Sequence, residues 1–242
     1  MPLSRVLFVS DLHLAGERPD TTGRFRRFVE TVVPGASALY ILGDLFEAWP
    51  GDDALSLPFE SEIAALLRAA SSHAPLFFMH GNRDFVLGET FARATGATLL
   101  ADPSTIDLHG RRAVLLHGDT LCTDDREYQA FRAQVRSPAW QAAALARPLA
   151  ERIALAKGLR AGSQAAKESK TETIMDVNDD AVRRAFAESG CDLMIHGHTH
   201  RPARHEHVVG DRRCERWVLP DWYEGGGYLV ATPGRLETVA LG

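Results

Sequence analysis

Seven polar side chains occur in short clusters along the chain, and their types are those that bind divalent metal ions. They are Asp11, His13, Asp44, Asn82, His117, His198 and His200. Carboxylate, amide and imidazole ligands without thiolates suit two divalent ions of the manganese, iron or zinc type. Two neighbouring ions can share the charge of a bound phosphoryl oxygen and activate a water. A single Asp is usually a turn residue or helix cap, and a single loop His is usually solvated, so the prediction depends on the whole set.

Each cluster directly follows an apolar run with the length and composition of a β-strand. The five runs are residues 6–10, 38–42, 75–79, 113–117 and 192–195. Helix-like segments lie between several of them, at residues 22–33, 58–70 and 176–188. Strands that alternate with helices predict an α/β sheet, whose sites lie at the carboxyl ends of its strands. Asp11 and His13 are two residues apart, so in extended backbone both can reach one ion.

The length and composition predict one globular domain over residues 1–242. The chain has 242 residues and 45% apolar composition, and its longest apolar runs are far shorter than the roughly 20 residues of a membrane span. We therefore expect neither a signal peptide nor a transmembrane helix. Three cysteines, Cys122, Cys191 and Cys214, lack CxxC spacing, which predicts reduced thiols in a cytosolic protein.

The middle of the chain differs from the rest in charge. The net charge of -5 argues against a nucleic-acid binder, yet residues 120–170 hold nine basic and five acidic residues, +4 here and -9 elsewhere. Apolar residues recur in this region at helical spacing: Tyr128, Phe131, Val135, Trp140, Leu145, Leu149, Ile153, Leu155 and Leu159. The pattern predicts a helical hairpin with one apolar face. That face could simply pack on the core, and the charges could be a solvated helical surface.

The motifs "DLH", "GDLFEAW", "GNRDF", "LHGD" and "GHTH" resemble those of the calcineurin-like metallophosphoesterase superfamily over nearly the whole chain. Longer stretches, "ALYILGDLFEAW", "HGNRDFVLG", "LHGDTLCTDD", "YQAFRAQVR" and "IMDVN", are similar to the hydrolases that act on UDP-2,3-diacylglucosamine in bacterial lipid A biosynthesis. The resemblance implies an α/β fold, a layered αββα metallophosphoesterase sandwich. It also implies an inserted helical lid at about residues 122–175.

The resemblance also implies roles for individual residues around two Mn²⁺ ions. Asp11, His13 and His200 are matched to one ion, Asn82, His117 and His198 to the other, and Asp44 bridges them. Asp44, Asn82, Arg83 and His198 are matched to catalysis. The implied substrate contacts are Asn82, Arg83, Asp125, Ser163, Lys167, Lys170 and His198. Lys167 departs from the pattern, because some members carry asparagine there.

The implied reaction is hydrolysis of the pyrophosphate bond of UDP-2,3-diacylglucosamine. A metal-activated water attacks the α-phosphorus and gives 2,3-diacylglucosamine 1-phosphate and UMP. Because this substrate is amphiphilic, the resemblance implies a peripheral protein on the cytoplasmic face of the inner membrane. The apolar helical face would hold acyl chains, and its arginines would approach the anionic membrane surface.

Arg83 stands where many metal-dependent phosphoesterases have a histidine. A guanidinium cannot act as a general acid because its pKa lies above about 12, but it can clamp phosphate oxygens and stabilise developing charge. A departing phosphate monoester has a second pKa near roughly 6, so it needs charge stabilisation more than a proton. Arg83 therefore favours a pyrophosphate substrate, unless it forms an ordinary surface pair with Asp84.

Two other classes of function compete with this prediction. One is another dinuclear-metal phosphoesterase, such as a nucleotide pyrophosphatase or a phosphoprotein phosphatase, which the apolar segment and Arg83 disfavour. The other is a non-catalytic scaffold on the same fold, which the complete ligand set disfavours. The sequence leaves open the oligomeric state, the acyl length, the ion used in the cell and the residues that contact uridine.

Overall fold

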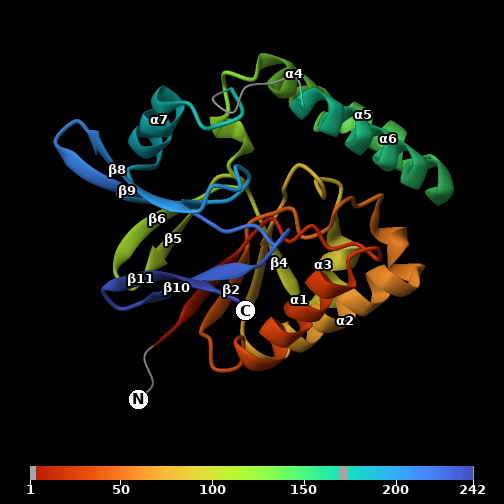
Figure 1. Cartoon of the computed structure of the whole chain (residues 1–242), viewed down its shortest axis with the longest axis horizontal. Coiled ribbons are helices and arrows are strands. Elements are labelled where there is room, and N and C mark those ends of the chain that lie inside the picture. The colour runs from red at the N-terminus through yellow and green to blue at the C-terminus, as the bar shows by residue number, and fades with distance from the viewer. Residues whose placement is uncertain (1–3, 169–173, 242) are drawn as a thin grey trace.

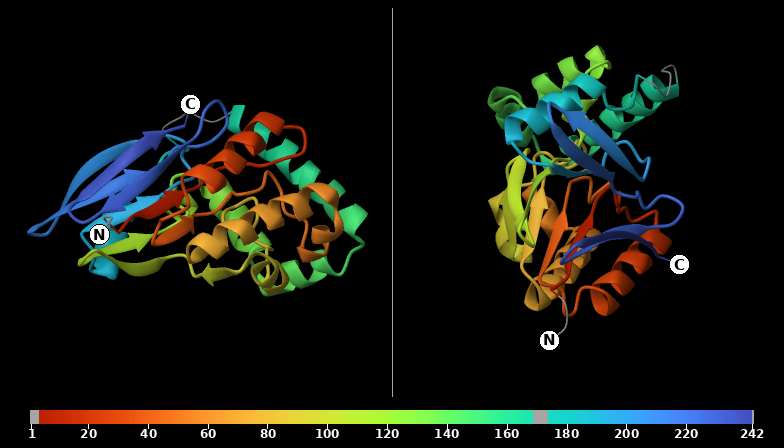
Figure 2. Two further views of the ribbon diagram at one scale, coloured as in Figure 1. Left: turned by 90° about the horizontal axis from the view of Figure 1, so that it is seen from below. Right: turned by 90° about the vertical axis from the view of Figure 1, so that its left-hand side faces the viewer.

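The computed structural model describes residues 4–168 and 174–241. Its strands form two sheets, and helices cover the outer face of each sheet (Figure 1). The first sheet has the strand order β11-β10-β1-β2-β3-β4, and the second has the order β5-β6-β7-β9-β8. Figure 2 shows the resulting layers from two further sides. This architecture confirms the predicted layered α/β sandwich.

The two sheets contain eleven described strands. The first sheet is formed by β1 (Val6–Val9), β2 (Ala38–Ile41), β3 (Leu76–Met79), β4 (Ala97–Leu100), β10 (Gly227–Thr232) and β11 (Arg235–Ala240). The second is formed by β5 (Ser104–Leu108), β6 (Arg111–Leu115), β7 (Leu193–His196), β8 (Ala203–Val209) and β9 (Arg212–Val218). Strands β1 to β4 are parallel, as are β6, β7 and β9.

Seven α-helices and two short 3₁₀ helices complete the described elements. The α-helices are α1 (Pro19–Thr31), α2 (Pro58–His73), α3 (Glu89–Thr95), α4 (Arg126–Val135), α5 (Pro138–Leu145), α6 (Leu149–Glu168) and α7 (Asp179–Ser189). The 3₁₀ helices are η1 (Asp52–Ser56) and η2 (Asp119–Leu121).

The parallel strands are buried on both faces, which explains their continuous apolar runs. In β1, Leu7 and Val9 pack toward the helices, in the same apolar cluster as Phe25 of α1 and Ile63 of α2. The intervening Phe8 packs against the second sheet. The alternation follows from the two-residue period of a strand, which places successive side chains on opposite faces of the sheet.

The second sheet carries α7 on its outer face, where Phe186 packs with residues of β6 and β7. The helix begins three residues later than predicted, because the Asn178 side chain caps it by accepting hydrogen bonds from the backbone N–H groups of Asp180 and Ala181. It ends before Gly190, whose φ of 66° suits a left-handed C-cap. Helix α1 begins at Pro19, earlier than predicted, because proline suits a first helical turn.

Helices α4, α5 and α6 form a continuous stretch that we call the helical segment. In Figure 1 it runs along the upper edge of the molecule. The sequence predicted a hairpin, whereas the structure has three helices. Ser137 caps α5 by accepting a hydrogen bond from the Trp140 N–H, and Pro138 begins that helix. A second proline, Pro148, precedes α6, and it disfavours helical backbone at the residue before it.

The three cysteines are free and buried, as predicted for reduced thiols. Among the helices of the described residues, none combines the length and the apolar character needed to cross a membrane.

Candidate metal centre

The seven candidate ligands come from loops that follow five strands, and the structure brings these loops together. Asp11 and His13 follow β1, Asp44 follows β2 and Asn82 follows β3 in the first sheet. His117 follows β6, and His198 and His200 follow β7, in the second sheet. Because β1, β2 and β3 are parallel, as are β6 and β7, their carboxyl ends meet at one edge of the sandwich.

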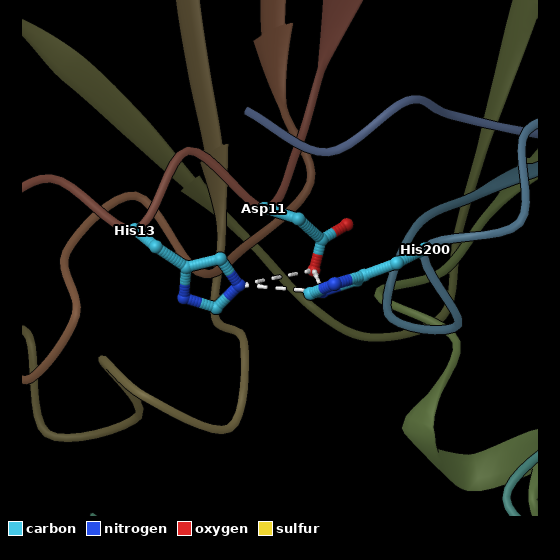
Figure 3. Close-up of side chains that lie close together, drawn as sticks. All are labelled: Asp11, His13 and His200. Carbon is cyan, nitrogen blue, oxygen red and sulfur yellow. Dashed lines mark hydrogen bonds and ion pairs between the residues drawn. The ribbon is translucent and has the colours of Figure 1, made fainter. Parts of the chain in front are cut away.

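Asp11, His13 and His200 form the first group of potential ligands (Figure 3). The Nε2 atom of His13 lies 3.3 Å from Nε2 of His200 and 4.0 Å from Oδ1 of Asp11. His200 Nε2 lies 3.4 Å from the same Asp11 oxygen. Three ligand atoms therefore converge on one point, with Asp11 and His13 buried.

Asp44 lies between this group and a second one. Its Oδ2 atom is 3.8 Å from Nε2 of His13, and its Oδ1 atom is 3.7 Å from Nε2 of His117. Asp11, Asp44 and His117 also form a possible ligand cluster, in which all three residues are buried. One carboxylate oxygen faces each group, which is the orientation that a bridging ligand needs.

Asn82 joins the two histidines of the second group. Its Oδ1 atom lies 3.1 Å from Nε2 of His117 and 3.0 Å from Nδ1 of His198. The other ring nitrogen of His117, Nδ1, lies 2.8 Å from the Leu42 carbonyl oxygen. When Nδ1 donates to this carbonyl, the lone pair of Nε2 points into the site, as a metal ligand requires.

The backbone of the site is held in an uncommon conformation. Five of the seven candidates have positive φ angles between 49° and 70°: Asp11, His13, Asp44, His198 and His200. Left-handed backbone is costly for residues with a Cβ atom and clusters at functional sites. Two glycines allow close approach, since a Cβ on Gly81 would overlap the Asp44 carboxylate and one on Gly197 would overlap the Asp11 carboxylate.

The charges of the site favour bound cations. Burial raises the pKa of Asp44, the charge of His117 opposes this, and the nearby Asp11 carboxylate adds to the increase. Burial disfavours charged His117, but the carboxylates of Asp44, Asp119 and Asp11 raise its pKa to about 9. Protons thus neutralise crowded buried carboxylates here, and metal cations would do the same. The donor set and the charge of these residues fit two divalent ions.

The sequence left open a surface pair between Asp84 and Arg83, and the position of Asp84 in the structure contradicts this alternative. The side chain is fully buried and accepts hydrogen bonds from the N–H groups of Gly81, at 2.8 Å, and Leu45, at 2.8 Å. Burial and the Asp44 charge raise its pKa to about 7. Asp84 therefore joins the loops after β2 and β3, and it leaves the Arg83 side chain for another role.

A cavity of about 560 Å³ extends from the candidate ligands to the helical segment. Five predicted substrate contacts line it: Asn82, Arg83, Asp125, Ser163 and His198. Lys170 and the side chain of Lys167 lie outside the described residues. The Nε atom of Arg83 is buried and has no hydrogen-bond partner among the described residues. A guanidinium in this position can bind an anionic ligand in the cavity.

The far end of the cavity is apolar. Its lining includes Trp49, Phe85, Val86, Phe131, Val135, Trp140, Leu145, Leu155 and Leu159. Trp140 lies next to Phe85, with ring centroids 6.0 Å apart, and Leu145 is 43% exposed. The apolar face of the helical segment thus contributes to a cavity, in addition to any packing against the core.

Tyr128 and Tyr223 also lie at the site, although neither was predicted to have a role there. The Tyr128 ring lies 5.8 Å from that of His198, and its hydroxyl donates a 2.8 Å hydrogen bond to buried Asp119. The Tyr223 ring stacks on His13 at 4.7 Å. Tyr128 was predicted only as part of an apolar helix face, and Tyr223 occurs in a loop without a recognisable motif.

Arginines connect the helical segment to the rest of the protein. Arg132 donates to Asp119 at 2.7 Å, and Arg136 donates to the Gly81 carbonyl at 2.9 Å. Arg152, only 6% exposed, bonds to the Pro50 carbonyl and pairs with Asp53, while Arg160 pairs with Glu47. These four arginines thus form hydrogen bonds or ion pairs with residues outside the helical segment. The other described basic residues of the segment, Arg126, Arg147 and Lys157, are exposed.

Residues 4–202 match the family model described as calcineurin-like phosphoesterase. The chain is 51% identical to a UDP-2,3-diacylglucosamine hydrolase of Xanthomonas axonopodis pv. citri, over 97% of this chain and 99% of that protein. It is 53% identical to a UDP-2,3-diacylglucosamine hydrolase of Cellvibrio japonicus, over 93% and 94% of the two chains. The fold is also similar to that of an archaeal phosphodiesterase, with a TM-score of 0.50 at 13% identity and coverage of 98% and 99%.

Proposed function

The chain belongs to the calcineurin-like phosphoesterase family, and we propose that it hydrolyses UDP-2,3-diacylglucosamine to 2,3-diacylglucosamine 1-phosphate and UMP. It is a hydrolase, and the relatives that share about half of its sequence are named as hydrolases. The assignment of this substrate rests on two features of one cavity: a cluster of potential metal ligands at one end and an apolar lining at the other. A diacylated nucleotide sugar has one diphosphate and two acyl chains to match them.

Two Mn²⁺ ions fit the candidate ligands. Asp11, His13 and His200 would hold one, Asn82, His117 and His198 the other, and Asp44 would bridge them. When bound, such ions activate water and neutralise phosphoryl charge. Other divalent ions suit the same nitrogen and oxygen donors.

Arg83 would bind the diphosphate and stabilise the charge that develops on the leaving group. Arg83 and Asn82 both line the cavity, and the Arg83 backbone N–H is fixed by a 2.8 Å hydrogen bond to Asp44 Oδ1. The sugar 1-phosphate leaves without needing a proton, because its second pKa is near roughly 6. Arg83 can therefore assist without transferring a proton, which a guanidinium cannot do at neutral pH.

The helical segment would act as a lid, over about residues 122–175 of a single domain that spans residues 1–242. Leu155, Leu159 and Trp140 line the apolar end of the cavity, where acyl chains would lie. The exposed Arg126, Arg147 and Lys157 would face anionic lipid headgroups. The protein would thus act in lipid A biosynthesis as a peripheral enzyme at the cytoplasmic face of the inner membrane.

Product analysis in ¹⁸O-labelled water tests the reaction. With Mn²⁺ and detergent-dispersed UDP-2,3-diacylglucosamine, we expect UMP and the lipid 1-phosphate in equal amounts, with ¹⁸O in UMP. Label in the lipid product would place the attack on the other phosphorus. An absence of both products, with Mn²⁺ supplied and the protein folded, would refute the proposed function.

A further inference from the structure

A second, smaller cavity adjoins the loop that carries His198 and His200. Its volume is about 230 Å³, and it is lined by Asp176, Thr199, Arg201, His205, Arg216 and apolar residues that include Val218. Figure 1 shows β8 and β9, which contribute four of the lining residues, beside α7. Thr199 and Arg201 also line the large cavity, so the two cavities adjoin at this loop.

Arg216 is the most unusual group of this cavity. Its side chain is only 5% exposed, and its guanidinium donates to Nε2 of His196 at 3.1 Å and Nε2 of His207 at 3.3 Å. The Nδ1 atom of His196 lies 2.8 Å from the Gly197 carbonyl oxygen, so Nδ1–H donates to this carbonyl and Nε2 accepts from Arg216. No carboxylate in the described residues forms an ion pair with Arg216, although it lines the cavity. A buried cation of this kind calls for a further hydrogen-bond acceptor.

Hydrogen-bond acceptors and donors both line the same cavity. The Asp176 carboxylate is fixed by the Val177 N–H, at 2.8 Å, and by Arg201 Nη1, at 2.6 Å. Burial disfavours its charged form, but these hydrogen bonds lower its pKa, so it stays an acceptor at neutral pH. The Thr199 hydroxyl is buried and has no hydrogen-bond partner among the described residues. One carboxylate acceptor thus lies among three side chains able to donate.

Uracil has the complementary pattern on its Watson–Crick edge, where an N–H donor stands between two carbonyl acceptors. Proteins read an exposed base through hydrogen bonds to this edge. We propose that the small cavity is the nucleobase subsite for uridine nucleotides, with Asp176 accepting from the ring N3–H and Arg216 and Thr199 donating to the carbonyl oxygens. Val218 and Pro202 would pack against the ring.

The location of the cavity agrees with this assignment. The inference rests on the proposed function, because a uridine subsite requires a uridine nucleotide as substrate. The large and the small cavity share Thr199 and Arg201 in their linings. A substrate with its diphosphate at the candidate metal ligands can therefore extend its acyl chains to one side and its nucleoside to the other.

Calorimetric titration of the Mn²⁺-loaded full-length protein with UMP, CMP and ribose 5-phosphate tests the subsite. All three probes carry the phosphate, so differences report the base. Cytosine has an amino donor where uracil has a carbonyl acceptor. We expect UMP to bind at least about 10-fold more tightly than either competitor, a difference of about 1.4 kcal/mol. Equal affinities for all three probes would overturn the subsite.

Variants of the lining residues test whether the preference for UMP over CMP arises in this cavity. Asp176→Asn and Arg216→Gln should each bring the UMP and CMP affinities within about threefold of one another, whereas Arg213→Gln, at an exposed position of β9, should retain the parent ratio. If the buried Arg216→Gln variant does not fold, Asp176→Asn decides, because Asp176 is partly exposed. An unchanged ratio in folded Asp176→Asn would place the base elsewhere. Binding is measured without turnover, so failure of the proposed lipid reaction remains a separate result.

Discussion

The candidate metal centre and the helical segment meet in one cavity, but they are held in place in different ways. The centre is formed by loops at the ends of buried parallel strands, and its two carboxylates and two of its four imidazoles, those of His13 and His117, are buried. The helical segment has few buried residues and is fastened by arginines to carboxylates and carbonyl groups. From this comparison we propose that the fold positions the candidate metal ligands, while the helical segment selects the substrate.

The difference also appears in how each region tolerates change. At the centre, five ligand candidates adopt left-handed backbone, and such strain persists only where surrounding structure over-determines it. In the segment, apolar side chains such as Leu145 and Phe131 are more than one third exposed. Substitutions at the centre should therefore abolish the reaction, whereas those in the segment should change which substrate is used.

The largest effect is expected from Asp44→Asn. One Asp44 oxygen faces His13 and the other faces His117, so a neutral amide would weaken both metal sites. We expect turnover to fall to background and the content of both metals to drop, as measured by elemental analysis and activity. Near-normal turnover with two bound metals would show that Asp44 does not bridge.

Arg83→Ala should have the next largest effect and should leave the metal content intact. Deleting one preorganised group that stabilises developing charge lowers turnover by on the order of 10²-fold. Arg83→Lys should recover only part of this loss, because an ammonium keeps the charge but lacks the bidentate fork. A lysine variant with parental kcat would show that the fork geometry is irrelevant.

Two leucines of α6 provide a matched pair in the helical segment. Leu155 lines the apolar end of the large cavity, whereas Leu149 does not. Losing the burial of one leucine against an acyl chain costs about 1.5–3 kcal/mol, so Leu155→Asp should lower kcat/KM for the lipid roughly 10- to 100-fold. Leu149→Asp should have a smaller effect. Equal losses in both variants, or loss of metal in either, would argue against an acyl site there.

The smallest effect on activity is expected from a substitution of Asp102, near the junction of the candidate metal centre and the helical segment. Burial and the Asp119 charge raise its pKa to about 6, from 3.8, and both carboxylate oxygens lack hydrogen-bond partners within the described structure. Between these pH values the folded state binds more protons than the unfolded state, so this group makes stability fall as pH rises from about 4 to 6.

Asp102→Asn should remove this part of the pH dependence. Relative to the parent, the variant should gain up to about 3 kcal/mol of unfolding free energy at pH 8 and little at pH 4. Urea unfolding at both pH values measures the difference, with Asp211→Asn at an exposed position as the control. An equal change at pH 4 and pH 8 would contradict the assigned pKa.

The sequence predicted the positions of the candidate ligands in the fold better than other features, because each follows an apolar strand closely. Local pattern alone placed Asp11, Asp44 and His117 at strand ends, and the fold brought them together. The resemblance supplied the two ligand sets and the α4–α6 insertion. The edge strands β8 and β11 were not predicted, because their exposed faces lack long apolar runs.

Other features depend on contacts between distant parts of the chain. Asp84 looks like a surface residue in "GNRDF", but the approach of the loop after β2 buries it. Tyr223 reaches His13 only because the chain returns to the site after β9. Neither property can be read from local spacing, since both follow from tertiary packing.

The most direct test of the account compares kcat/KM for UDP-2,3-diacylglucosamine with that for UDP-glucosamine, in one detergent and with Mn²⁺ supplied. Each buried methylene contributes roughly 0.8 kcal/mol, and part of this energy would order the helical segment and orient the diphosphate. The account predicts a preference for the acylated substrate of more than about 10²-fold, or ~2.7 kcal/mol. Values within about tenfold, or ~1.4 kcal/mol, would contradict it, because the apolar cavity would then not be an acyl site.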